Sequence, residues 1–206
     1  MTYYPDLSSY DFARGHPPGT KNVGWLQKGH QFEKAIPTED TLDSLWSLCT
    51  ISMMQTRGVH QCDLCETPQT VYAVRHGIRV LLGTSEIRVF SRGGDVSPLR
   101  RHLRERESGG LLFIQSSTVP FAIYAAPTLV YHYVRTHHYK PPDEFLRALS
   151  EEPRPPSPKY FERLKELNLE WRGAGSPHAS PTGLRFAKTE DASPAWLTHS
   201  VHLDES

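Results

Sequence analysis

The chain has 206 residues, 37% of them hydrophobic, and its 23 basic and 23 acidic side chains give a formal net charge of zero. This length suits one domain, and the balanced charge excludes a whole-chain field that would steer nucleic acid or anionic membrane. Three cysteines, two of them in one Cys-x-x-Cys, do not make a secreted disulfide framework. No signal-peptide pattern and no apolar run of ~20 residues occurs. We therefore expect a soluble protein of the reducing cytoplasm, without a membrane span.

The first 37 residues place aromatic side chains among glycines and prolines, which predicts irregular chain packed on a core. Within this part, Val23–Leu26 predicts a short strand. The first clear helix is expected over residues 38–49, because Thr38 is a capping residue and two acids follow it. The apolar positions of this helix fall on one face: Leu42, Leu45, Trp46 and Cys49. We therefore expect Cys49 to be a core thiol.

The Cys-x-x-Cys pair, Cys62 and Cys65, follows this helix and precedes a β-rich region. Three short runs there predict strands separated by turn residues: Val71–Arg75, Ile78–Leu82 and Ser85–Phe90. A cysteine knuckle that leads into a β-hairpin is a recurring way to build a small metal site, and the order of elements here fits that arrangement.

Residues 91–110 interrupt the β-rich pattern with a glycine pair near each end and a basic stretch between them. The arginines on which we focus are Arg100, Arg101 and Arg104. We interpret this stretch as a solvated loop inserted in the domain. The alternative is a contact surface for nucleic acid or for an acidic protein.

After this loop, the apolar runs Leu111–Gln115 and Val119–Tyr124 predict central strands. Helices are expected over residues 127–138 and 142–149, each beginning at or near a proline. Residues 1–150 are therefore predicted to form a single α+β domain, in which helices pack on a small, mainly antiparallel sheet.

Residues 151–206 are predicted to lie beyond that domain. The prolines of residues 151–158 indicate a stiff linker, and Tyr160–Leu169 has the apolar spacing of a short amphipathic helix. From Arg172 onward glycine, serine and proline dominate, which predicts a flexible tail.

The strongest chemical signal is the cysteine pair, because two thiolates at this spacing can bind one tetrahedral cation. No second Cys-x-x-Cys occurs, so histidines or carboxylates must complete the site. We predict a structural zinc site with two sulfur and two nitrogen ligands, from Cys62, Cys65, His60 and His132. His60 stands two residues ahead of the pair, and His132 lies on a predicted helix that could pack across it. Further candidate ligands are His30, His137 and His138.

Three functions are consistent with such a site. The first is a zinc-stabilised accessory protein that acts through a protein partner. The second is a metal-dependent hydrolase with an open zinc position and Glu66 or Glu86 as general base. The third is a nucleic-acid-binding protein that uses the basic loop. The sequence favours the first, because it contains none of the metallohydrolase or zinc-deaminase motifs.

The chain also carries a set of short motifs: Gly24-Trp25-Leu26, Gly29-His30-x-Phe32, Arg57-Gly58-x-His60-x-Cys62-x-x-Cys65, Leu82-Gly83-Thr84-x-Glu86-Ile87-Arg88-Val89 and Tyr124-Ala125-Ala126-Pro127-x-Leu129-Val130-Tyr131-His132-Tyr133-Val134. Together they resemble a family of small uncharacterised bacterial proteins that occur as stand-alone domains. The resemblance covers roughly residues 20–150, with the basic loop at 91–110 and the tail from 151 outside it. It implies a compact domain with a Cys/His site and specifies no reaction.

Overall fold

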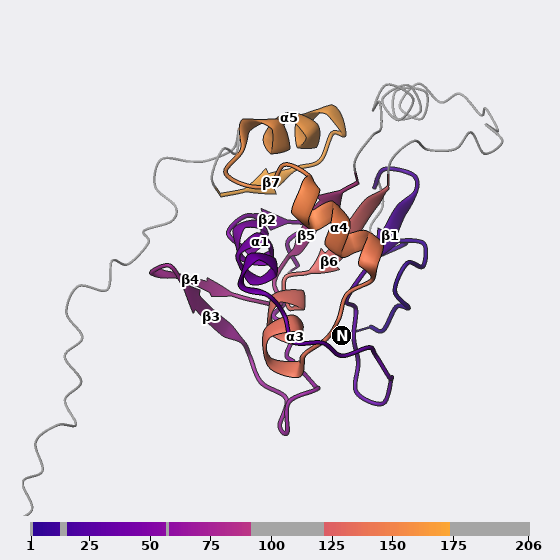
Figure 1. The fold of residues 1–206 in the computed structure, drawn as a ribbon, viewed down its shortest axis with the longest axis vertical. Helices are drawn as coiled ribbons and strands as arrows, with labels where there is room; N and C mark the ends of the chain where they lie inside the picture. The colour runs from indigo at the N-terminus through magenta and orange to yellow at the C-terminus, as the bar shows by residue number, and fades with distance from the viewer. Residues whose placement is uncertain (1, 13–15, 57, 92–121, 174–206) are drawn as a thin grey trace, which may run out of the picture.

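The computed structural model describes residues 2–12, 16–56, 58–91 and 122–173 (Figure 1). Its larger sheet has five strands in the order β1-β6-β5-β2-β7. The strands are β1 (Thr20–Asn22), β2 (Ser52–Met53), β5 (Glu86–Phe90), β6 (Ile123–Pro127) and β7 (Trp171–Arg172). Only the β1–β6 pair is parallel among the pairings described. This mainly antiparallel sheet with separate helices confirms the predicted α+β class.

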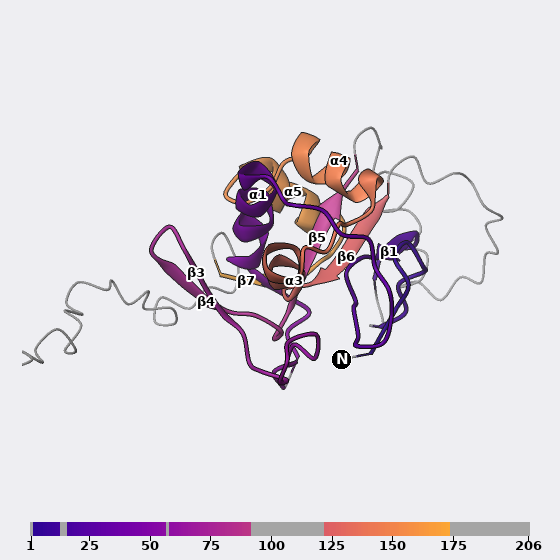
Figure 2. The same ribbon diagram turned by 60° about the horizontal axis from the view of Figure 1, so that its bottom comes forward.

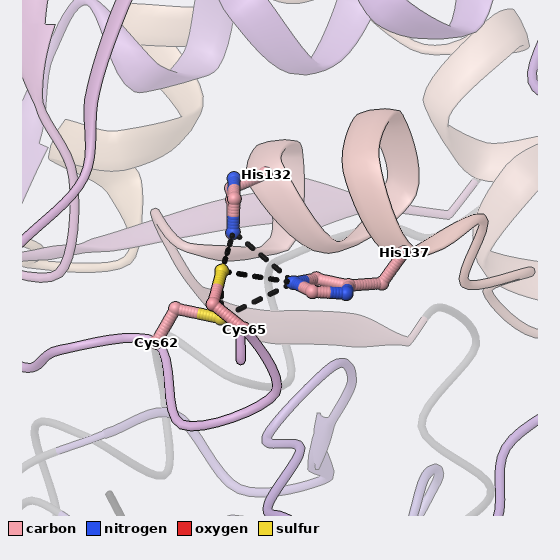
Figure 3. A group of neighbouring side chains, drawn as sticks. All are labelled: Cys62, Cys65, His132 and His137. Atoms are coloured by element: carbon pink, nitrogen blue, oxygen red, sulfur yellow. Dashed lines mark hydrogen bonds between the residues drawn. The ribbon is translucent and has the colours of Figure 1, made fainter. Parts of the chain in front are cut away.

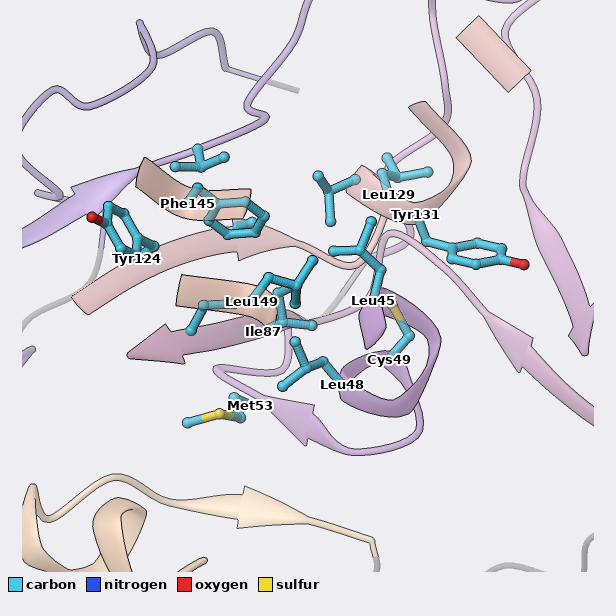
Figure 4. Close-up of a cluster of buried hydrophobic side chains, with 14 of the residues drawn as sticks. Leu45, Leu48, Cys49, Met53, Ile87, Tyr124, Leu129, Tyr131, Phe145 and Leu149 are labelled. Carbon is cyan, nitrogen blue, oxygen red and sulfur yellow. The ribbon is translucent and has the colours of Figure 1, made fainter. Parts of the chain in front are cut away.

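The described residues form four helices, α1 (Glu39–Cys49), α3 (Val130–His137), α4 (Asp143–Glu151) and α5 (Pro158–Glu166). Helix α1 packs against both α3 and α4, and α1 and α4 also contact β5. Figure 4 shows the resulting core, where Leu45, Ile87 and Phe145 are fully buried. The predicted cap is present, since the Thr38 hydroxyl accepts a hydrogen bond from the Thr41 N–H at 3.2 Å.

Strands β3 (Tyr72–Arg75) and β4 (Ile78–Leu81) form a separate antiparallel hairpin. Figures 1 and 2 show that this hairpin projects from the body of the protein, away from the five-stranded sheet. The predicted turn at His76 and Gly77 is present, with φ angles of 50° and 72°. The hairpin follows the Cys-x-x-Cys loop directly and leads back into β5.

The segment after residue 151 returns to the domain. Tyr160 and Leu164 of α5 are buried in the same core as α1 and α4, and the Tyr160 hydroxyl donates to the Arg88 carbonyl at 2.9 Å. Strand β7 pairs with β2, with Trp171 opposite Met53. Residues that we placed beyond the domain therefore contribute to its core, while residues 174–206 lie outside the described part of the chain.

The start of α3 differs from the predicted helix at 127–138. Residues 123–127 are strand β6, which pairs along its length with β5, from Ile123 opposite Phe90 to Pro127 opposite Glu86. The helix begins only at Val130. Pro127, where the predicted helix would have started, is instead paired with Glu86 in the sheet. The predicted strand at Leu111–Gln115 and the basic loop lie outside the described residues, apart from Ser91.

A buried ion pair links β5 to the amino-terminal segment. Arg88 is fully buried, and its Nη1 donates to Glu86 Oε2 at 2.6 Å. The Tyr10 hydroxyl lies 2.9 and 3.0 Å from the two oxygens of the same carboxylate and donates to it. The Arg88 guanidinium also lies over the Tyr10 ring, 5.0 Å from its centre. Glu86 is thus held inside the domain by two partners.

None of the helices described has both the length and the apolar character needed to cross a membrane.

Candidate metal centre

The two cysteines lie in a short closed loop. The Cys62 N–H donates to the Gln69 carbonyl at 3.0 Å, and the Gln69 N–H donates to the Cys62 carbonyl at 3.3 Å. These bonds bring Cys65 back toward Cys62, so that the two sulfurs lie 3.6 Å apart. Cys62 is fully buried and Cys65 is half-buried. We refer to residues 62–69 as the knuckle loop.

Helix α3 supplies two histidines that face the knuckle loop (Figure 3). His132 Nε2 lies 3.4 Å from the Cys65 sulfur. His137 Nε2 lies 3.3 Å from the Cys62 sulfur and 3.5 Å from the Cys65 sulfur. The two Nε2 atoms are 3.2 Å apart, and the imidazole planes are nearly perpendicular at 85°. Four ligand atoms from two segments thus converge on one point, all within 4.8 Å of one another.

The separations of these atoms can be compared with those around a tetrahedral zinc ion. Bonds of about 2.3 Å to sulfur and 2.0–2.1 Å to nitrogen would place two sulfurs about 3.8 Å apart, sulfur and nitrogen about 3.5 Å apart, and two nitrogens about 3.3 Å apart. The sulfur–sulfur distance is 3.6 Å, three of the four sulfur–nitrogen distances are 3.3–3.5 Å, and the nitrogen–nitrogen distance is 3.2 Å. Five of the six pairwise separations therefore match those around a tetrahedral ion, and the remaining pair, Cys62 and His132, lies within the 4.8 Å that spans the group.

The protonation of the histidines also suits a metal ligand. Burial lowers the pKa of His132 to about 4, and the neighbouring His137 and Arg135 add to that effect. Burial likewise lowers the pKa of His137. Both rings are therefore neutral near pH 7, the form in which imidazole binds metals. His132 Nδ1 is hydrogen-bonded to the Thr136 hydroxyl at 3.2 Å, and when Nδ1 is the donor Nε2 is free for the ion.

The cysteine thiols behave differently. Burial raises the pKa of Cys62 to about 11, and the backbone N–H groups of Cys65 and Leu64 oppose that rise. In a metal-binding Cys-x-x-Cys loop, backbone N–H groups of this kind point toward the cysteine sulfurs. Cys62 is therefore a protonated thiol near pH 7 in the absence of a cation, and it must lose its proton to become a ligand.

The structure brings together Cys62, Cys65 and His132 from the predicted ligand set, and His137 rather than His60 is the fourth member. His60 lies outside the group because its backbone is paired with Gly83, whose carbonyl accepts the His60 N–H at 2.8 Å. Gly83 has a φ of 81°, and a Cβ at this position would stand 2.3 Å from the His60 carbonyl oxygen. This close approach fixes the course of the chain ahead of the knuckle loop.

The sequence offers His137 only as a further candidate, and it is five residues from His132. Side chains on one helical face are three or four residues apart. His137 is the last residue of α3, and His138 after it takes a left-handed conformation with a φ of 57°. The other candidate, His30, instead stacks on Tyr3 with a ring separation of 3.7 Å.

The structure describes both carboxylates considered for the hydrolase alternative. Glu66 is exposed on the knuckle loop, and Glu86 is held in the buried ion pair with Arg88. Neither carboxylate belongs to the group of four ligand atoms. The arginines of the predicted nucleic-acid contact, Arg100, Arg101 and Arg104, lie outside the described residues.

Comparison with protein families matches residues 2–99 and 100–150 to a domain of unknown function, DUF7919. The chain belongs to this family, which confirms the resemblance to an uncharacterised domain family. The match is wider than the motifs suggested, since it begins at residue 2 and includes the basic loop at 91–110. Searches of curated proteins and of solved structures found no match. The function must therefore be argued from the site.

Proposed function

We propose that this DUF7919 protein binds one zinc ion at Cys62, Cys65, His132 and His137, and that the ion is structural. One observation carries the proposal: two sulfurs and two imidazole nitrogens converge, and five of their six separations match those around a tetrahedral ion. A structural zinc site has four protein ligands, whereas a catalytic one keeps a position open for water or substrate. The ion would fasten the knuckle loop to α3.

The donor set supports zinc among the divalent metals. Two thiolates and two imidazoles in a tetrahedral arrangement are typical of zinc, while magnesium, calcium and manganese take oxygen ligands. A bound zinc ion supplies folding free energy of about 10–16 kcal/mol in small structural sites. The chain's own contribution is to hold both histidine rings neutral and to bring the two sulfurs together before the ion arrives.

A matched pair of histidine variants tests this assignment. His137→Ala is expected to lose the zinc, because it removes one of the four ligands. His60→Ala is expected to keep one zinc per chain, because His60 lies outside the group. Elemental analysis of protein purified without a metal-affinity tag measures both. Loss of zinc from His60→Ala with retention in His137→Ala would contradict the ligand set.

The protonation states predict how zinc affinity depends on pH. Both cysteines must lose a proton to bind, whereas His132, with a pKa near 4, is already neutral at pH 7. Protons therefore compete with zinc at the sulfurs, and affinity falls as the pH falls. We expect about two protons released per zinc between pH 7 and 8, and hence an apparent association constant that rises about 100-fold per pH unit. Calorimetry in buffers of different ionisation enthalpy measures this number, and release of no protons would contradict thiolate ligation.

We propose further that the protein works in the cytoplasm as an accessory protein that acts through a protein partner. None of the three cysteines forms a disulfide bond, which fits a reducing compartment. The projecting hairpin leaves Tyr72 and Val74 of β3 54% and 58% exposed, on one face of the strand. Apolar side chains at that exposure are available for a contact with another protein.

A photoreactive amino acid in place of Tyr72 tests the partner. It is expected to form one discrete adduct in cells, and the adduct is expected to weaken when Val74 is also changed to threonine. The same reagent at the exposed Glu66 serves as the control. Equal labelling from the two positions, or no adduct from the hairpin, would contradict a role for this face.

A further inference from the structure

The last residue of α3 is also a ligand of the proposed zinc site. His137 ends the helix, and His138 after it takes a left-handed conformation with a φ of 57°. The terminal turn of a helix lacks part of its backbone hydrogen bonding and frays easily. Yet His137 Nε2 lies within 3.5 Å of both cysteine sulfurs. Contacts from outside the helix must therefore hold this turn in place.

The amino-terminal segment, residues 2–12 and 16–36, supplies the first of these contacts. The Ala35 N–H donates to the His138 carbonyl at 2.9 Å, and the Lys140 N–H donates to the Glu33 carbonyl at 2.8 Å. The two bonds flank an isolated antiparallel bridge between the segments. This pairing begins at the residue directly after His137.

The Tyr139 side chain makes the second contact. It is fully buried, and its hydroxyl donates to Asp6 Oδ2 at 2.8 Å. The other oxygen of this carboxylate accepts the Gly24 N–H, also at 2.8 Å. The Tyr139 ring packs edge-on against Phe32, with a ring separation of 5.9 Å. Asp6 thus connects the residue two positions after His137 to the backbone of the amino-terminal segment.

The same segment also packs on the start of α3. Gly24 has a φ of 70°, and a Cβ at this position would lie 2.8 Å from Val130 Cγ2, so the backbone there packs directly on the first residue of the helix. Helix α3 is therefore held near both ends by one segment. Since this helix carries His132 and His137, the segment determines where both imidazoles lie relative to the knuckle loop.

We propose that Tyr139 is a positioning residue of the metal centre, which acts through its hydrogen bond to Asp6 to keep the last turn of α3, and with it His137, in the geometry that binds zinc. The inference rests on the proposed zinc site. Without this bond, His137 spends part of its time away from the cysteines, and the apparent zinc affinity falls in proportion to the fraction of chains still in place.

The chain offers a matched control for the test. Tyr124 is also buried, and its hydroxyl also donates to a carboxylate, that of Glu144, at 3.2 Å. This bond joins β6 to α4, and neither element carries a member of the metal group. Tyr139→Phe and Tyr124→Phe therefore remove the same atom and the same kind of hydrogen bond, once beside a ligand and once between elements without one.

Two measurements separate positioning of the ligand from a general loss of stability. Competition with a chromophoric chelator gives the zinc dissociation constant, and the cobalt-substituted protein gives the intensity of the visible ligand-field bands. Tyr139→Phe is expected to weaken zinc binding by about 10-fold, the equilibrium factor of one hydrogen bond to a charged group. It is also expected to lower the band intensity, because a displaced imidazole admits water and the site departs from tetrahedral geometry. Tyr124→Phe is expected to weaken binding less and to keep the natural spectrum.

Each other outcome has a definite meaning. A Tyr139→Phe protein with natural zinc affinity and a natural cobalt spectrum would overturn the inference and leave the zinc site standing. Equal weakening in the two variants, with both spectra unchanged or both altered alike, would assign Tyr139 to general stability and would also overturn the inference. A natural chain that binds neither zinc nor cobalt would overturn the proposed function and this inference together.

Discussion

Replacing Cys62 with serine is expected to abolish zinc binding and, with it, the cooperative unfolding transition of the protein. Cys62 is fully buried and lies 3.3 Å from His137 Nε2 and 3.6 Å from the Cys65 sulfur, so its loss leaves three ligands. The binding free energy of a structural zinc, about 10–16 kcal/mol, is as large as the net stability of a whole domain, about 5–15 kcal/mol. Thermal unfolding followed by circular dichroism, with and without zinc, measures the effect.

Cys49→Ala is the control for this change. Cys49 is equally buried on α1, where its sulfur is 3.7 Å from the Thr128 carbonyl, and it is not part of the metal group. This variant is expected to keep one zinc and a cooperative transition at a somewhat lower temperature. A Cys62→Ser protein that unfolds like Cys49→Ala, with the same zinc content, would contradict a stabilising role for the ion.

Replacing Glu86 with glutamine is expected to destabilise the protein by about 3–5 kcal/mol, since it leaves a buried charge without its counter-charge. The Arg88 guanidinium is fully buried and stays protonated in all conditions that proteins tolerate. Its Nε and Nη2 atoms have no hydrogen-bond partner among the described residues, so Glu86 provides the neutralising charge. Urea unfolding of the zinc-loaded protein measures this loss.

Two further variants test whether an uncompensated charge, rather than lost packing, causes the destabilisation expected for Glu86→Gln. Arg88→Met is expected to be less damaging than Glu86→Gln, because a carboxyl group left without its partner can take up a proton and become neutral. The double variant Glu86→Leu with Arg88→Met is expected to recover most of the loss, as buried ion pairs replaced by apolar side chains do. A double variant no more stable than Glu86→Gln would show that packing, rather than uncompensated charge, is responsible.

The elements that the sequence predicted well are those with a local signal. Thr38 and the apolar face that ends at Cys49 define α1 without reference to the rest of the chain. The start of α3 depends instead on long-range pairing, because β6 continues through residues 125–127, beyond the end of the strand predicted at Val119–Tyr124. The packing of α5 and β7 on the core also depends on long-range contacts. Tyr160 donates a hydrogen bond to the Arg88 carbonyl of β5, and Trp171 pairs with Met53 of β2.

The same distinction applies to the metal centre. Cys62 and Cys65 could be predicted from their spacing, and His132 from its place on a helix. His137 could not be preferred over His60, since proximity along the chain favoured His60 and helical periodicity disfavoured a partner five residues from His132. The deciding features are the end of α3 at His137 and the pairing of His60 with Gly83, and both depend on the folded chain.

X-ray absorption at the zinc edge of the natural protein tests the central claim most directly, because it counts the ligands by element. We predict two sulfur ligands at about 2.3 Å and two imidazole nitrogens at about 2.0–2.1 Å, unchanged in His60→Ala. Fewer than two sulfurs, or an oxygen ligand in place of one histidine, would contradict a closed site formed by Cys62, Cys65, His132 and His137.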